Sequence, residues 1–144
     1  KKMSKTIQLT APLSNEIHKI VVDELPTSPK GEGDKTPGQY RKYNVQITKS
    51  KHLPPDWMRV DEYMNELLDF INQDKGPKFD LLKTAIAHHR FVWIHPFGNG
   101  NGRTVRLFTY AMLIKLGFNV DVGRIINQQP YSAITGIIMS NILN

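Results

Sequence analysis

The sequence predicts a mostly α-helical domain with one small β-hairpin. Apolar residues recur at helical spacing in several segments, whereas apolar and polar residues alternate strictly in only one short stretch. The chain has 144 residues, 40% hydrophobic and 22% charged. This composition fits one domain over 1–144 and excludes a disordered, collagen-like or coiled-coil protein. The first Met is residue 3, which suggests a piece of a longer protein.

The first predicted helix spans 13–25, and Ser14 or Asn15 would cap its N-terminus. Five apolar side chains would share its buried face: Leu13, Ile17, Ile20, Val21 and Leu25. Residues 26–39 hold several prolines and glycines, so they predict a loop.

The alternating stretch lies in the next segment. Tyr43, Val45 and Ile47 alternate with polar residues, which predicts a half-buried strand. Residues 49–51 would turn it back into a hairpin that ends near Pro54. A two-stranded hairpin is marginal by itself, so we expect it to pack on helices.

Two helices are predicted after the hairpin. Asp56 or Asp61 would cap the first, which runs to about Gln73. Asp80 would cap the second, over 81–94. Its expected buried side chains are Leu82, Ala85, Ile86 and His89, with Trp93 also in the core and Trp57 of the preceding segment partly buried.

The C-terminal part is predicted to be helical as well. A helix over 103–116 would end with Gly117 as its C′ residue. Residues 124–128 and 131–143 also have helical patterns, separated by Pro130.

Composition excludes several kinds of function. The chain has no cysteine, so it has no disulfide, no thiol nucleophile and no cysteine–zinc site. No apolar run reaches about 18 residues and no signal sequence is recognised, so we expect a cytoplasmic protein without a membrane span. Residues 1–60 carry +5 of the net charge of +6. Their lysines are scattered without aromatic residues, which makes a nucleic-acid partner the weakest hypothesis.

Residues 95–106 carry most of the chemical information. They read His-Pro-Phe-Gly-Asn-Gly-Asn-Gly-Arg-Thr-Val-Arg and lead into the predicted helix over 103–116. Glycines at 98, 100 and 102 allow a close backbone approach, and a helix N-terminus adds unpaired N–H groups, which together favour a bound phosphate. Arg103 and Arg106 lie three residues apart, so both can reach that phosphate.

A histidine beside such a loop can act as a general base. His95 precedes the glycines, and an ordinary imidazole titrates near a pKa of about 6.5. Phe97 would point the other way and fix the loop to the core. The spacing of the glycines and the helix before them do not fit a Walker A motif or a dinucleotide-binding turn.

The same run resembles the Fic-domain signature H-x-F-x-[D/E]-G-N-G-R-x-x-R, and only Asn99 departs from it. Residues 37–41, Pro-Gly-Gln-Tyr-Arg, resemble the segment that precedes the family's flap, and the 43–53 hairpin would occupy the flap position. The resemblance covers about residues 10–144. It implies a Fic-type helical bundle that transfers AMP from ATP to a Tyr, Ser or Thr hydroxyl of a target protein.

The resemblance also implies roles for individual residues. His95 would deprotonate the hydroxyl, and the flap would hold the target segment by strand addition. The nucleotide phosphates would be bound by Gly98, Gly100, Asn101, Gly102, Arg103 and Arg106. The target-docking residues would be Asn44, Val45, Gln46, Ile47 and Thr48.

Asn99 leaves two functions open. The family's acid at this position binds Mg²⁺, and an asparagine oxygen is a ligand without charge. Either Mg²⁺ is held mainly by the phosphates and water, or the chain binds nucleotide with slow or no transfer. The residue also leaves open whether ATP or another nucleotide is the donor.

Three alternatives stay open for inhibition of such a site: an antitoxin-like partner, a segment outside the chain, or no inhibition at all. Residues 28–33 match the family's inhibitory pattern [S/T]-x-x-x-E-[G/N], but Pro29, Gly31 and Gly33 disfavour the helix that inhibition needs. His18 and His52 have no partner that the sequence reveals.

Overall fold

A computed structural model describes residues 9–27 and 30–118. Within these ranges the chain forms α2 (Ala11–Val21), α3 (Val60–Asn72), α4 (Asp80–Ile94) and α5 (Asn101–Lys115). Short 3₁₀ turns, Trp57–Arg59 and Pro77–Phe79, precede α3 and α4. The mostly helical prediction is confirmed. The predicted helices at 124–128 and 131–143 lie outside the described residues.

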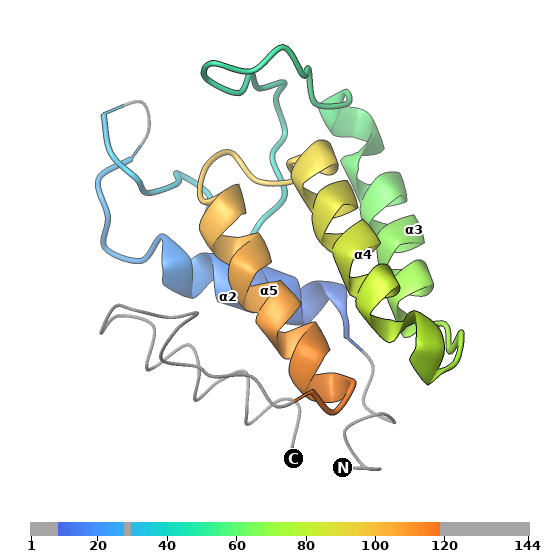
Figure 1. The fold of residues 1–144 in the computed structure, drawn as a ribbon. Helices are drawn as coiled ribbons and strands as arrows, with labels where there is room; N and C mark the ends of the chain where they lie inside the picture. Colours follow the sequence, from blue (N-terminus) through green and yellow to red (C-terminus); the bar gives the residue numbers. More distant parts are fainter. Residues whose placement is uncertain (1–8, 28–29, 119–144) are drawn as a thin grey trace.

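The helices pack in the order α3, α4, α5, with α2 crossing beside α5 (Figure 1). Large apolar side chains fill the space between them. The most deeply buried include Ile17, Met64, Leu67, Phe91, Phe97, Leu107 and Phe108. No helix in the described ranges is long and apolar enough to cross a membrane.

The capping residue and the bounds of α2 differ from the prediction. Thr10 caps α2 instead of Ser14 or Asn15, and its hydroxyl accepts the Leu13 N–H at 3.4 Å. The helix therefore begins two residues before the predicted start and ends at Val21. Leu25 lies beyond that end and is exposed.

For α3, α4 and α5, some of the predicted capping residues are confirmed and others are not. Asp56 caps the 3₁₀ turn before α3, where its carboxylate accepts the Met58 N–H at 2.9 Å. Asp80 is the first residue of α4 and caps nothing with its side chain. The predicted end of the fourth helix is confirmed, since Gly117 follows the cap with a φ of 89°.

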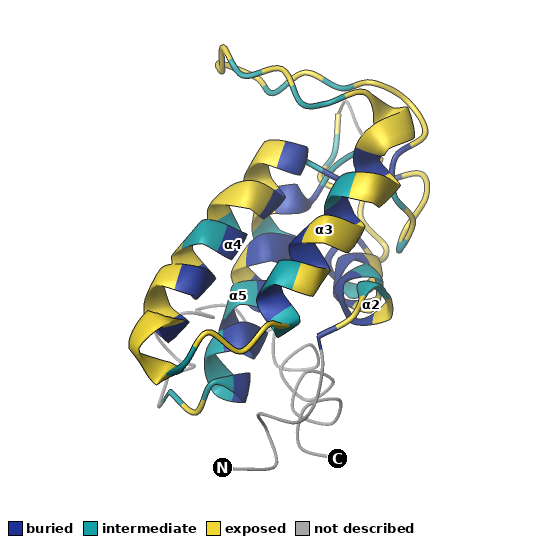
Figure 2. Cartoon of the chain, turned by 90° about the vertical axis from the view of Figure 1, so that its right-hand side faces the viewer, coloured by how far each residue is buried: buried dark blue, intermediate teal, exposed yellow. Residues whose placement is uncertain are grey.

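The buried face of α4 differs from the prediction. Four residues predicted to be buried lie instead on the exposed side, and Ile86 is half-buried; the four are Leu82, Ala85, His89 and Trp93. The outer surfaces of α3 and α4 in Figure 2 are largely exposed. The buried positions are Asp80, Lys83, Thr84, Ala87, Phe91 and Ile94. Polar residues tolerate burial here because Lys83 donates to the Gln73 carbonyl at 2.7 Å and Thr84 to the Asp80 carbonyl at 2.9 Å.

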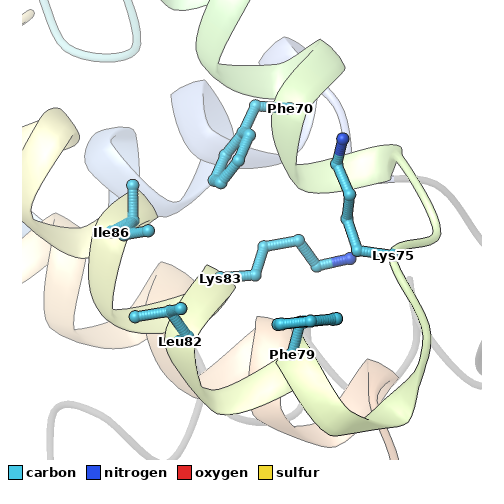
Figure 3. Close-up of a pocket in the computed structure, with 6 residues that line it drawn as sticks. All are labelled: Phe70, Lys75, Phe79, Leu82, Lys83 and Ile86. Atoms are coloured by element: carbon cyan, nitrogen blue, oxygen red, sulfur yellow. The ribbon is translucent and has the colours of Figure 1, made fainter.

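The exposed side of α4 contributes to an apolar pocket of about 230 Å³ beside the end of α3 (Figure 3). Its lining residues are Phe70, Lys75, Phe79, Leu82, Lys83 and Ile86. Leu82 was expected in the core and instead lines this open pocket.

The predicted hairpin is wrong for the described structure. Residues 43–53 form an extended loop, with a turn in which the Ser50 N–H donates to the Ile47 carbonyl at 3.2 Å. No strand ladder pairs the two arms, and residues 9–27 and 30–118 contain no sheet that could support an otherwise marginal hairpin. Val45 and Ile47 are half-buried between exposed neighbours as expected, whereas Tyr43, predicted on the same side, is exposed.

The orientation of α4 can be tested with two substitutions on opposite faces. We expect Phe91→Ala to lower the free energy of unfolding by about 3–5 kcal/mol, because it removes a ring from the core. Leu82→Ala should change it by about 0.5 kcal/mol or less, because Leu82 is 57% exposed. Urea unfolding measures both, and equal losses would contradict the described orientation.

Candidate functional site

The loop between α4 and α5 is held by its own side chains. His95 ends α4 in the left-handed region, with φ 52° and ψ 62°. Phe97 is fully buried, as predicted, and stacks on the His18 ring with centroids 3.8 Å apart. The Asn101 amide donates to the Phe97 carbonyl at 2.8 Å and accepts its N–H at 2.9 Å. The loop therefore has a fixed shape before any ligand binds.

Residues 98–102, the glycine loop, need their glycines at two places. Gly100 has a φ of 79°, a conformation that side chains disfavour. A Cβ at Gly98 would overlap the Tyr43 hydroxyl. Gly100 is the N-cap of α5, and no side chain caps the helix there. The first-turn N–H groups of α5 therefore have the arrangement expected of an anion site.

The two predicted phosphate-binding arginines have different surroundings. Arg103 donates to the Glu32 carbonyl at 2.6 Å and to the Val21 carbonyl at 3.4 Å. Arg106 is exposed, and no hydrogen bond or ion pair joins it to another described residue. A Cβ at Gly102 would lie 3.3 Å from Arg106 Nη1, so this guanidinium lies beside the first turn of α5.

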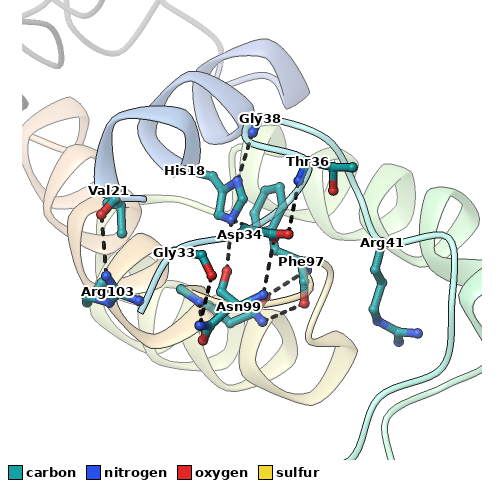
Figure 4. A network of polar contacts seen from close by, with 12 residues as sticks. His18, Val21, Gly33, Asp34, Thr36, Gly38, Arg41, Phe97, Asn99 and Arg103 are labelled. Atoms are coloured by element: carbon teal, nitrogen blue, oxygen red, sulfur yellow. Dashed lines mark hydrogen bonds and ion pairs between the residues drawn. The ribbon is translucent and has the colours of Figure 1, made fainter. Parts of the chain in front are cut away.

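A buried histidine on α2 supports the glycine loop from behind (Figure 4). His18 Nδ1 accepts the Gly38 N–H at 2.9 Å, so we assign the proton to Nε2, which faces the Asn99 carbonyl at 2.8 Å. Burial lowers the pKa of His18, which keeps the ring neutral near pH 7. Sequence reasoning gave His18 no partner, although a histidine beside Ile17 on an apolar helix face was a signal.

Asp34 completes this support. Its carboxylate accepts the Thr36 N–H at 3.2 Å and the Asn99 N–H at 3.3 Å, and it lies 3.3 Å from His18 Nε2. Nothing in the sequence singled out Asp34, because its partners are brought together only by the fold. The segment that contains it, residues 31–34, is called the strap below.

Arg41 joins the extended 43–53 loop to the end of α4. The side chain is 1% exposed. Its guanidinium donates at 2.7–3.2 Å to the backbone carbonyls of Tyr43, Pro55, Ile94 and His95. The Arg41 N–H also donates to the Pro96 carbonyl at 2.8 Å. Sequence reasoning identified the segment that contains Arg41 but not this role.

His95 has the environment of a neutral base. Burial, and then the positive charge of Arg41, lower its pKa from 6.5. Its Nδ1 is buried without a well-formed hydrogen bond, although the Val92 carbonyl is close enough to oppose the lowering. Nε2 is therefore the nitrogen left to meet a substrate.

Asn99 does not fit the metal site that the resemblance implies. Its Nδ2 donates to the carbonyls of Gly31 and Gly33, and its Oδ1 accepts the Gly100 N–H. The described ranges contain no group of three His, Cys, Asp or Glu side chains that could hold a metal ion. Position 99 therefore offers a neutral amide that is already hydrogen-bonded to the backbone, whereas Mg²⁺ prefers a charged oxygen ligand.

The strap is not the inhibitory helix that the pattern at 28–33 would require. Gly31 and Glu32 form a bend, and Gly33 forms an isolated β-bridge with Thr27. Glu32 contacts Arg103 through its backbone carbonyl, not its carboxylate. Ser28 and Pro29 lie outside the described residues.

Comparisons with known proteins agree with the local motif. Residues 8–113 match the model of the Fic/DOC family. The chain is 34% identical over 95 residues to a protein adenylyltransferase Fic of Nematostella vectensis, covering 65% of this chain and 22% of the relative. It is 32% and 30% identical over 111 residues to protein adenylyltransferase fic-1 of Caenorhabditis briggsae and Caenorhabditis elegans. These alignments cover 74% of this chain and 22% of each relative.

The histidine environments predict how stability depends on pH. The pKa values of His18, His88 and His95 are all lowered from 6.5 in the folded protein. Just below pH 6.5 the unfolded chain binds more protons, so the free energy of unfolding should be greatest above about 6.5 and fall as the pH drops toward the folded pKa values.

Urea unfolding at about pH 7.5 and about pH 5.5 checks this expectation. His18→Gln, which removes one of the titrating groups, should reduce the loss on acidification. A pH dependence equal to that of the unchanged protein would contradict the role given to His18.

Proposed function

Since the chain belongs to the Fic/DOC family, we propose that it transfers AMP from ATP to a hydroxyl group of a target protein. The observation that carries the proposal is the placement of His95. A histidine with a lowered pKa directly precedes a preshaped loop at an uncapped helix N-terminus. The names of the relatives as protein adenylyltransferases support the same reaction class.

In the proposed reaction, His95 Nε2 takes the proton of the attacking hydroxyl. The hydroxyl oxygen forms a bond to the α-phosphorus of ATP. The bond between that phosphorus and the oxygen that bridges it to the β-phosphorus breaks. Pyrophosphate leaves with the electron pair, and AMP remains on the protein. A neutral His95 is needed for the first step, and its lowered pKa provides it at pH 7.

The glycine loop would hold phosphate oxygens through the N–H groups at the start of α5. Such donors stabilise charge that develops in the transition state, and losing one typically costs about 3–4 kcal/mol. Arg106 is the better placed arginine for the outer phosphates, because Arg103 already bonds two carbonyls. Asn99 does not fit as a metal ligand, because its amide donates to the Gly31 and Gly33 carbonyls.

The 44–48 segment is the proposed docking site for the target. Residues 44–47 pair with no strand in the described ranges, and a turn begins at Thr48, where the Ile47 carbonyl accepts the Ser50 N–H. The side chains of 44–48 alternate between exposed and half-buried. Strand addition uses backbone hydrogen bonds, so it tolerates many target sequences. Arg41 would keep this segment near His95, since it bonds both Tyr43 and His95.

A second candidate is nucleotide binding without transfer. The specific observation in its favour is Asn99, whose amide is bound to the strap. The two candidates differ in whether labelled AMP becomes covalently attached to protein.

The role of His95 as general base is tested by incubating the protein with α-phosphate-labelled ATP, Mg²⁺ and host-cell lysate. We expect His95→Ala to abolish the labelling of protein while ATP binding persists. His89→Ala is a matched control, because His89 is an exposed histidine on the same helix. Equal labelling by His95→Ala would exclude the proposed base, and ATP binding without any label would favour the second candidate.

The same assay has an expected pH profile. With the pKa of His95 below 6.5, transfer should be constant above about pH 6.5 and decline at lower pH as the imidazole becomes protonated. The measurement is kcat/KM for ATP across this range. A rate that rises on acidification would be inconsistent with His95 as the base.

We expect Arg106→Ala to weaken ATP binding without destabilising the fold. Because Arg106 has no hydrogen-bond or ion-pair partner among the described residues, its loss should change the free energy of unfolding by about 0.5 kcal/mol or less. ATP affinity should fall about tenfold or more, as expected for a lost charged phosphate contact. Calorimetric titration and urea unfolding measure the two quantities, and unchanged affinity would remove Arg106 from the site.

A further inference from the structure

Asn99 has a partner for every polar group that it carries (Figure 4). Its backbone N–H donates to Asp34 and its carbonyl accepts from His18. Its Oδ1 accepts the N–H of Gly100. The two protons of its Nδ2 serve the carbonyls of Gly31 and Gly33, at 3.2 Å and 3.1 Å.

An acid at position 99 would not fit these contacts. An ionised carboxylate has no proton, so it could not donate to the two strap carbonyls and would face their oxygen atoms instead. It would also add a negative charge next to the buried carboxylate of Asp34, which already accepts the Asn99 N–H. The surroundings therefore select an amide and disfavour a carboxylate.

The strap also reaches the phosphate-binding machinery through Arg103. Its three successive carbonyls, at residues 31, 32 and 33, are bound by Asn99, Arg103 and Asn99 in turn. The Asn99 amide thus holds the carbonyls on either side of the Glu32 carbonyl, which accepts from the Arg103 guanidinium. It also holds the residue that precedes the left-handed Gly100.

We propose that Asn99 is a positioning residue, whose amide fastens the strap to the glycine loop and thereby sets the positions of Gly100 and Arg103. In this chain it occupies the place of a metal-ligating acid without taking that role. Restoring the acid should therefore loosen the site instead of improving it. Only the activity measurement below rests on the proposed transferase function.

The first test is amide hydrogen exchange in Asn99→Asp. The matched control is Asn72→Asp, because Asn72 also donates to two carbonyls, those of Leu9 and Leu68, and meets Lys115 at the far end of α5. We expect Asn99→Asp to speed exchange about tenfold or more in peptides covering 30–38 and 97–104, as for a lost local hydrogen-bond set. Asn72→Asp should leave those peptides unchanged.

Two outcomes would overturn the inference: unchanged exchange in Asn99→Asp, or the same increase at 30–38 and 97–104 in both variants. If Asn99→Asp does not fold, Asn99→Ala replaces it, since alanine removes the donors without adding a charge. Asn99→Gln keeps two amide donors on a longer arm, so it should recover part of the protection that Asn99→Ala loses.

The second test is transfer with labelled ATP and Mg²⁺. We expect Asn99→Asp to raise KM for ATP about tenfold with a smaller change in kcat, because phosphate-binding groups are displaced while His95 stays in place. Increased kcat/KM in Asn99→Asp would show that a missing metal ligand was the limitation and would overturn the inference. If the unchanged protein transfers no label, the transferase proposal fails, whereas hydrogen exchange still decides the role of Asn99.

Discussion

The buried guanidinium of Arg41 is the contact on which the arrangement of the site depends. It is 1% exposed and bonds carbonyls from three separate parts of the chain. No carboxylate forms an ion pair with it in the described residues. The carbonyls at the end of α4 supply the compensating negative potential, since a helix C-terminus attracts a cation. One side chain therefore binds the last carbonyls of α4, ties the 43–53 loop to them and places a positive charge near His95.

Burial has a functional consequence because it keeps both histidines of the site neutral. For His95, burial and the Arg41 charge lower the pKa and leave an imidazole that can accept a proton. For His18, the Gly38 N–H requires an unprotonated Nδ1, so the neutral ring has a defined tautomer. The same physical effect thus supports the proposed chemical role of His95 and the structural role of His18.

The groups proposed to bind phosphate are held in place by contacts within the protein itself. The Asn101 side chain binds the backbone of Phe97. His18 and Asp34 bind the backbone of Asn99, and the Glu32 carbonyl of the strap accepts from Arg103. Preorganised donors avoid the cost of reorientation when charge develops, which suits phosphoryl chemistry. Arg103 is shared between the strap and the expected ligand, whereas Arg106 is available to the ligand alone.

The sequence by itself determined the features that depend on neighbours along the chain. Local spacing and conformational preference predict the motif at 95–106 and the helices near it. They also predict the burial of Phe97 and the helix end at Gly117. Family membership followed from the same residues. The roles of the individual site residues stay predictions.

Only the tertiary structure decided which surfaces and polar groups meet. The buried face of α4 depends on α3 and α5 on either side, and Lys83 can be buried because the Gln73 carbonyl is within reach. The 43–53 segment remains a loop because a strand needs a partner that periodicity cannot supply. Asn99 meets His18 and Gly31 across 81 and 68 residues, and such contacts exist only once the helices have packed.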